Sequence, residues 1–303
     1  MRIELKEILK NKAINGWRLF WLIATPMSIV MIIAMMGADM SNGAGVSEMI
    51  GFSVRFAVPF IYLVVAASSV QILFPGTFPM WWLRNRPYIG MCFAVAMAWQ
   101  GMFIFIMSNF FRDYYYADVY LLRDELEGTI GYIFLPAMVV TSFQFGRKHL
   151  NPMQWKLIHK SGIYFLWAYP FSVYWWNLNY YENPQTIDYI FYWGGFLAFA
   201  LRIAAWGKLR QQAAASTTPF AFKALGATII VFGLFVSASG LYWREAVTTF
   251  LTTPKWSADL VLWFLFWPFE PYLSLFIIGL GTMLLTKVST EARQQGVKAE
   301  FSQ

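Results

Sequence analysis

Very few side chains in this sequence belong to the types that carry out nucleophilic, acid–base or metal chemistry. Its 303 residues include one cysteine, Cys92, and two histidines, His149 and His159. A single cysteine excludes an intramolecular disulfide and a Cys-x-x-Cys metal or redox motif. The sequence also has no glycine-rich phosphate loop, GxSxG or HExxH motif. It therefore predicts no dinucleotide-binding module and no metal site, so any redox role would need electrons from a partner.

Glu270 lies in an unusual place, between Pro268 and Pro271 within an apolar run. A carboxylate inside a bilayer is costly unless it is paired, and such residues often mark ion or proton pathways. A helix broken at this point would resemble transporter sites, in which freed backbone groups and an acid bind a cation or a proton. The alternative is a helix that ends near Trp267, with Glu270 at a re-entrant bend. Both interpretations stay open on the sequence.

Uncharged polar side chains also fall inside apolar stretches, and Gln100 and Ser172 are two of them. We expect hydrogen bonds between helices to be their default role. Of the two histidines, His149 lies in a basic loop and is expected to be solvated. His159 follows that loop at the start of another apolar run, where it either anchors at the membrane interface or binds a ligand.

The elements that must position these residues are membrane-spanning helices. Of the chain, 58% is hydrophobic and only 13% is charged, about half the charged share of soluble domains. A span needs roughly 20 mostly apolar residues. The sequence therefore predicts an all-α bundle of about eight spans, the first of them retained instead of cleaved. The predicted spans are Trp17–Gly37, Phe52–Phe74, Tyr88–Asn109, Gly131–Phe145, Trp155–Trp176, Tyr189–Trp206, Lys223–Trp243 and Leu260–Thr286.

The basic residues fall mainly on one side of this bundle when the loops are assigned alternately. Of the 23 Lys and Arg residues, the exceptions are Arg55, Arg112, Arg123, Arg244 and Lys255. Acidic residues concentrate on the opposite side, within Asp113–Glu127. The positive-inside rule then predicts a multi-pass protein of the inner (plasma) membrane with both termini in the cytoplasm. The net charge of +7 reflects this topology, and no nucleic-acid partner is expected.

Three short motifs follow one another along the chain. They are Arg86-Pro87-Tyr88-Ile89-Gly90, Thr141-Ser142 and Trp155-Lys156-Leu157-Ile158-His159-Lys160. Their order resembles the ferric-reductase-like transmembrane family, and within it the haem-binding membrane subunits of bacterial methionine-sulfoxide reductase systems. The resemblance covers about residues 15–206. With the polar loop Gln211–Thr218 as a boundary, it predicts a six-helix core over 17–210, two additional helices over 211–286, and cytoplasmic segments 1–16 and 287–303.

The resemblance implies haem b held between the third and fifth spans by pairs of histidines on facing helices. At the family's core ligand positions this chain has Gln100, ten residues after Gly90, and Ser172, thirteen residues after His159. Neither is an ordinary iron ligand. His159 itself matches a histidine that the family places at the cytoplasmic end of the fifth span. Bis-histidine ligation of haem within the chain is therefore not supported.

Two functions stay open on the sequence. The first is electron transfer of ferric-reductase-like type, from a cytoplasmic flavoprotein to a quinone or a periplasmic redox partner, with haem sites lost or reduced. The second is a haem-free membrane scaffold, which serves as a partner subunit or as a transporter-like protein that uses Glu270.

Overall fold

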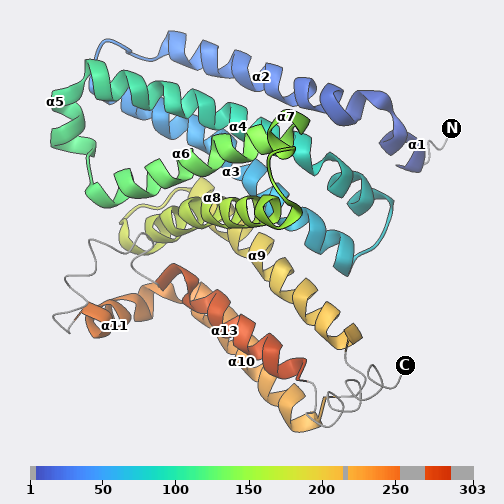
Figure 1. Cartoon of the computed structure of the whole chain (residues 1–303). Coiled ribbons are helices and arrows are strands. Elements are labelled where there is room, and N and C mark those ends of the chain that lie inside the picture. The colour runs from blue at the N-terminus through green and yellow to red at the C-terminus, as the bar shows by residue number, and fades with distance from the viewer. Residues whose placement is uncertain (1–4, 214–217, 253–269, 288–303) are drawn as a thin grey trace. The chain divides into compact units, whose positions relative to one another are not determined.

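The computed structural model of the protein describes residues 5–213, 218–252 and 270–287, and within these ranges every regular element is a helix (Figure 1). The predicted all-α class is therefore confirmed. The long helices are α2 (Gly16–Gly37), α3 (Gly43–Leu73), α4 (Thr77–Phe110), α6 (Leu122–Ser142), α8 (Pro152–Tyr180), α9 (Thr186–Ala213), α10 (Phe220–Ala238) and α13 (Glu270–Leu285). The shorter elements are α1 (Leu5–Lys10), η1 (Lys12–Ile14), α5 (Arg112–Tyr114), η2 (Tyr115–Val119), α7 (Gln144–Arg147) and α11 (Gly240–Thr252).

Five of the described helices, α2, α3, α4, α9 and α10, are long and apolar enough to cross a bilayer. Large apolar side chains point outward along them: Ile33 and Met36 of α2 are 63% and 80% exposed, and Phe235 of α10 is 67% exposed. Such surfaces are unfavourable in water and suit lipid. The protein is therefore a multi-pass integral membrane protein. Helices α6 and α8 are long but less apolar, and the count of eight spans stays a prediction.

The chain forms two compact units. Of the described residues, unit 1 contains 5–67 and 75–170, and unit 2 contains 68–74, 171–213, 218–252 and 270–287. Two helices contribute to both units, because α3 leaves unit 1 after Ala67 and α8 leaves it after Pro170. Of the predicted boundary loop Gln211–Thr218, the first three residues end α9, and residues 214–217 lie outside the described ranges. The division into a core of 17–210 and two added helices stays a prediction.

In unit 1, α4 packs against several neighbours. Buried apolar residues join it to α2 and to the first part of α3, in two clusters that contain Phe20, Ala24 and Cys92, and Val46, Met49, Phe103 and Met107. Helices α6 and α8 approach closely at Gly162, where an added Cβ would lie 2.3 Å from the sulfur of Met138. Small residues at such points let helix backbones pack closely within a bilayer, where the hydrophobic effect does not drive helices together.

Polar contacts tie the N-terminal segment to the start of α4. Asn85, which is 1% exposed, accepts a hydrogen bond from the backbone N–H of Gly16 at 2.9 Å and donates to Asn15 Oδ1 at 3.0 Å. Trp81 donates through Nε1 to the carbonyl of Ile14 at 3.0 Å. Gly16 has a φ of 65°, a conformation that glycine adopts without a steric penalty. These bonds determine where the chain enters α2.

In unit 2, the central contact joins α10 and α13. A Cβ added at Gly226 would lie 2.6 Å from the carbonyl oxygen of Gly281, and one added at Gly281 would lie 2.8 Å from the carbonyl oxygen of Gly226. Each glycine therefore faces the partner backbone directly. Lys208 of α9 donates to the carbonyls of Ile72 and Leu73 at 2.7 and 3.2 Å, so a cation stabilises the C-terminal end of α3.

The helix boundaries differ from the predicted spans at most ends: α6 begins at Leu122 instead of Gly131, for example, and α9 ends at Ala213 instead of Trp206. Helices α3 and α4 begin at Gly43 and Thr77, before the predicted starts at Phe52 and Tyr88, because the apolar run marks only the part of a helix suited to hydrocarbon. The predicted seventh span ends at Trp243, whereas α10 ends at Ala238 and α11 begins at Gly240. Gly240 packs so closely on Asn179 that a Cβ there would lie 2.3 Å from its Oδ1. Residues 260–269 of the predicted eighth span lie outside the described ranges.

Candidate functional site

His159, the histidine that the sequence offers as a candidate ligand, lies where the end of α6 meets the start of α8. Its Nε2 is 2.9 Å from Oγ1 of Thr141, in the last turn of α6. The ring of Trp155, one turn earlier on α8, stacks on the imidazole with centroids 4.3 Å apart, and its Nε1 donates to the carbonyl of Thr141 at 3.0 Å. We call Thr141, Trp155 and His159 the His159 cluster. It joins two of the three sequence motifs in space.

The hydrogen bonds of Thr141 indicate which nitrogen of His159 carries a proton. A threonine hydroxyl has one hydrogen, and Oγ1 of Thr141 lies 2.6 Å from the carbonyl oxygen of Ala137, which can only accept. The short distance favours donation of that hydrogen to Ala137, and we infer that the hydroxyl then accepts from a proton on Nε2 of His159. In this tautomer Nε2 has no lone pair for a metal, and the lone pair of the neutral ring lies on Nδ1. The ring faces are also restricted, since Trp155 covers one of them.

Local sequence explains how α8 begins beside this cluster. Asn151 accepts a hydrogen bond from the N–H of Gln154 at 2.8 Å through Oδ1, and Gln154 Oε1 accepts from the N–H of Asn151 at 3.0 Å. This reciprocal pair is a capping box, and Pro152 occupies the first helical position, where a missing N–H costs nothing. The cap sets the start of α8 and so places Trp155 and His159 one turn apart on the face toward α6.

Gln100, which the sequence resemblance predicted at a haem-ligand position, forms a contact between helices. Its Oε1 accepts a hydrogen bond from the hydroxyl of Tyr132 on α6 at 3.0 Å, and the same hydroxyl lies 3.1 Å from the carbonyl of Met97. Tyr132 also faces Gly101, at which an added Cβ would lie 3.2 Å from the tyrosine ring. The side chain of Gln100 thus joins α4 to α6, as expected for an interhelical hydrogen bond.

Ser172 and Glu270, the other two candidates, belong to unit 2. Ser172 lies on α8 two residues after Pro170. Glu270 is the first residue of α13 and is 1% exposed. A carboxylate in the first turn of a helix is favourable because it faces the positive end of the helix dipole. The residues that precede Glu270 lie outside the described ranges, so both interpretations of this carboxylate stay predictions.

The donor set does not fit a bis-histidine haem. His159 Nε2 is engaged by Thr141, Gln100 is bonded to Tyr132, and a serine hydroxyl is not an ordinary axial ligand. Among the described residues, no three His, Cys, Asp or Glu side chains come together as a metal site. His149, in the turn after α7, uses its backbone N–H to bond the carbonyl of Gly146 at 3.3 Å.

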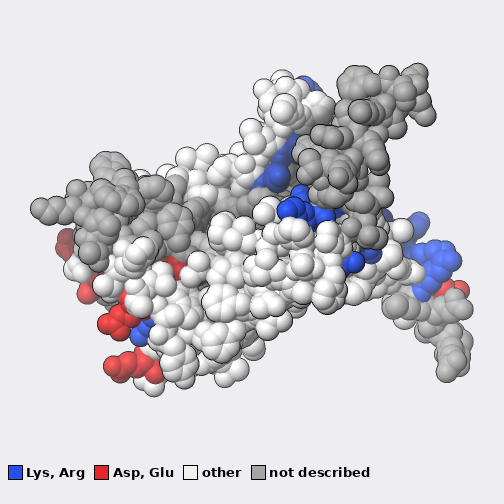
Figure 2. All heavy atoms as spheres, turned by 90° about the horizontal axis from the view of Figure 1, so that it is seen from below, with Lys and Arg blue, Asp and Glu red and all other residues white. Residues whose placement is uncertain are grey.

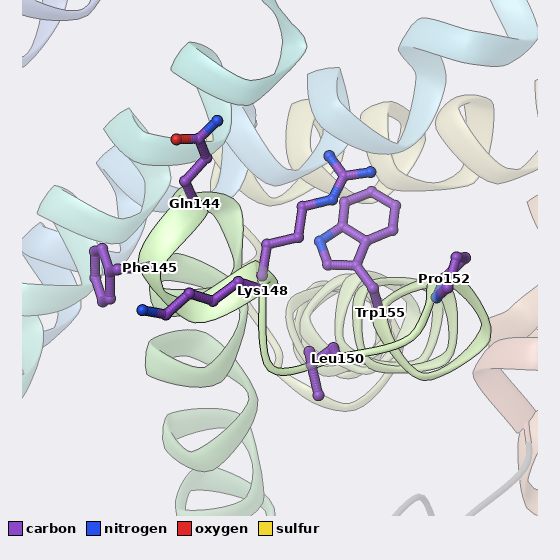
Figure 3. A pocket seen from close by; sticks show the side chains of 7 residues that line it. Gln144, Phe145, Lys148, Leu150, Pro152 and Trp155 are labelled. Atoms are coloured by element: carbon purple, nitrogen blue, oxygen red, sulfur yellow. The ribbon is translucent and has the colours of Figure 1, made fainter.

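A pocket of about 540 Å³ opens beside the His159 cluster, around the loop that joins α7 to α8 (Figure 3). We call it the Arg147 pocket. It is lined by Gln144, Phe145, Arg147, Lys148, Leu150, Pro152 and Trp155. The sequence identified the basic pair and Trp155 separately, but it gave no signal that they enclose a cavity.

Charges are segregated along unit 1. Arg84 and Arg86 lie in the first half of α4, and Asp113 follows its C-terminal end. Asp124 lies in the first turn of α6, and Arg147 follows its C-terminal end. Figure 2 shows most acidic side chains of the visible face gathered apart from most of the Lys and Arg. This separation agrees with the positive-inside pattern in the sequence.

No family model, curated protein or solved structure matches the chain. The fold and the apolar helices define the class of the protein: it is a multi-pass, all-α integral membrane protein that resides in a lipid bilayer.

Proposed function

We propose that the chain is a haem-free protein on a ferric-reductase-like scaffold, and that it serves in the membrane as a non-redox scaffold or partner subunit. The observation that carries the proposal is the bond between His159 Nε2 and Thr141, at 2.9 Å, with Trp155 stacked on the imidazole. The histidine that the family resemblance makes the best remaining ligand is here part of the packing between two helices.

The residue at the family's core position supports the same proposal. An axial haem ligand on α4 would need a free donor atom directed at the iron. Oε1 of Gln100 instead lies 3.0 Å from the hydroxyl of Tyr132, whose one hydrogen it shares with the carbonyl of Met97 at 3.1 Å. The bond serves the contact between α4 and α6 without any cofactor. The scaffold is then retained for its shape and membrane insertion, and electron transfer from a flavoprotein is not its role.

Absorption spectra of the wild type and of a variant with histidines at positions 100 and 172 test both the absence of haem and the ferric-reductase-like scaffold. The wild-type protein is purified from haem-replete cells together with the double variant Gln100→His/Ser172→His, and reduced-minus-oxidised spectra are recorded. We expect no haem b band in the wild type and a band in the double variant, because imidazoles then occupy the family's ligand positions. Gln100→Asn/Ser172→Thr is the matched control, since it alters the same positions without adding a ligand.

The two possible failures are distinguishable. Stoichiometric haem b in the wild type contradicts the haem-free function and favours electron transfer with a redox partner. A double variant that folds but takes up no haem counts against the ferric-reductase-like scaffold, whatever the wild type contains.

A further inference from the structure

Both cationic and apolar side chains line the Arg147 pocket. Arg147 and Lys148 supply two cationic groups, and no acidic residue is among the described residues that line the pocket. Phe145, Leu150 and Trp155 supply apolar surface in the same cavity. Its volume of about 540 Å³ lies within the range of small-ligand sites.

The guanidinium of Arg147 is held in a defined place. Its central carbon lies 4.9 Å from the centre of the Trp155 ring, in a cation–π contact. Trp155 is fixed in turn by its bond to the Thr141 carbonyl and by stacking on His159. A planar guanidinium that stacks through its face keeps N–H donors at its edge, in the fork geometry that matches a phosphate. The neighbouring Lys148 adds a second charge on an exposed side chain, which Figure 3 shows directed toward Phe145 and away from the guanidinium, and Gln144 adds an amide.

The surroundings favour a ligand that reaches the pocket from the bilayer. Phe145, which lines the pocket, is 60% exposed, so apolar surface of the pocket itself is open to the surroundings. Trp155 is of the residue type that concentrates at the headgroup level of membranes. A soluble phosphate compound would use the cations and leave this apolar surface uncovered. A phospholipid would cover both.

We propose that the Arg147 pocket binds the phosphate group of an anionic phospholipid, with the Arg147 guanidinium on the phosphate, the exposed Lys148 side chain turned toward it, and the acyl chains along the exposed Phe145. Phosphatidylglycerol-type lipids fit because they carry a net negative charge and a small headgroup. Lys and Arg side chains close to the membrane surface attract anionic headgroups. The site is independent of whether the chain binds haem.

Native mass spectrometry of the full chain in neutral detergent tests this site by counting bound lipid. The probes are dioctanoyl phosphatidylglycerol, dioctanoyl phosphatidylcholine and inorganic phosphate. We expect the wild type to bind the phosphatidylglycerol with clear preference over the other two. Each of Arg147→Gln and Lys148→Gln should weaken that binding about fivefold, and the double variant about 25-fold, since each interfacial cation contributes comparably.

Lys156→Gln and Lys160→Gln are matched controls, because both lysines are exposed on α8 and neither lines the pocket. They should leave the binding unchanged. Equal loss in these controls would show a general charge effect and overturn the proposal. Equal binding of the phosphatidylcholine, or inorganic phosphate competing fully at concentrations similar to those of the lipid, would overturn it as well. Circular dichroism of every variant checks that the helices are retained.

Discussion

The hydroxyl of Thr141 has one hydrogen, and the direction of that hydrogen determines what His159 can do. Donation to Ala137 at 2.6 Å leaves the hydroxyl as an acceptor, so His159 becomes the donor. The imidazole is then one member of a packed group, together with Trp155. At this scale the contact joins α6 to α8 through the side chains of Thr141, Trp155 and His159.

Removing the Thr141 hydroxyl should weaken the contact between α6 and α8. Thr141→Val keeps the volume but leaves the part-buried Nε2 of His159 without its partner, and we expect a loss of about 1–2 kcal/mol in the free energy of unfolding. Ser142→Ala is the matched control, because its hydroxyl only bonds the carbonyl of Met138 at an exposed position. Denaturant unfolding in mixed micelles measures both. Equal stability of Thr141→Val and wild type would show that the bond to His159 contributes nothing.

Asp39, in the turn between α2 and α3, makes the stability of that turn depend on pH. Hydrogen bonds from the hydroxyl and N–H of Ser41, at 2.5 and 3.1 Å, hold the pKa of this carboxyl below its ordinary value. A depressed pKa means that the stabilisation is complete above the ordinary value of about 3.9 and is lost as pH falls through the lower, folded value. We expect the protection of the Ser41 amide against hydrogen exchange to fall below about pH 4. The same protection in Asp39→Asn should not depend on pH in this window.

At the scale of elements, the contact of α10 with α13 depends on the absence of side chains at two facing glycines. Gly281→Ala would place a Cβ 2.8 Å from the carbonyl oxygen of Gly226, and backbone cannot move away cheaply. We expect a loss of about 1–3 kcal/mol from this overpacking. Gly279→Ala, two residues earlier on the same helix, meets no atom within 4 Å and serves as the control. Thermal unfolding in detergent should separate the two variants clearly, and coincident melting curves would contradict the close contact.

The sequence predicted a helix well where a local run of apolar residues marks both of its ends. The span Trp17–Gly37 agrees with α2, Gly16–Gly37, because an apolar run bounded by polar residues is visible in the chain itself. The early start of α3 at Gly43 was not visible, since helices continue past the apolar run. The motif residues Thr141 and His159 were identified, but their bond joins residues 18 apart through a short connecting helix. No sequence period encodes such a contact.

At the scale of the whole molecule, the predicted topology can be tested with introduced cysteines. The native Cys92 is fully buried, so it should react little with maleimides. Lys148→Cys and Asp118→Cys each place an exposed thiol, one in the basic loop and one in the acidic loop. By the positive-inside rule, a membrane-impermeant maleimide added outside should label only Asp118→Cys, and Lys148→Cys should require permeabilised cells. The reverse pattern would invert the orientation.

The haem content of the purified wild-type protein tests the central claim most directly. A pyridine haemochrome assay on protein from haem-replete cells gives the haem b bound per chain. The engagement of His159 by Thr141, and of Gln100 by Tyr132, predicts a ratio near zero. A ratio near one haem per chain would contradict the account and would make electron transfer the function to pursue.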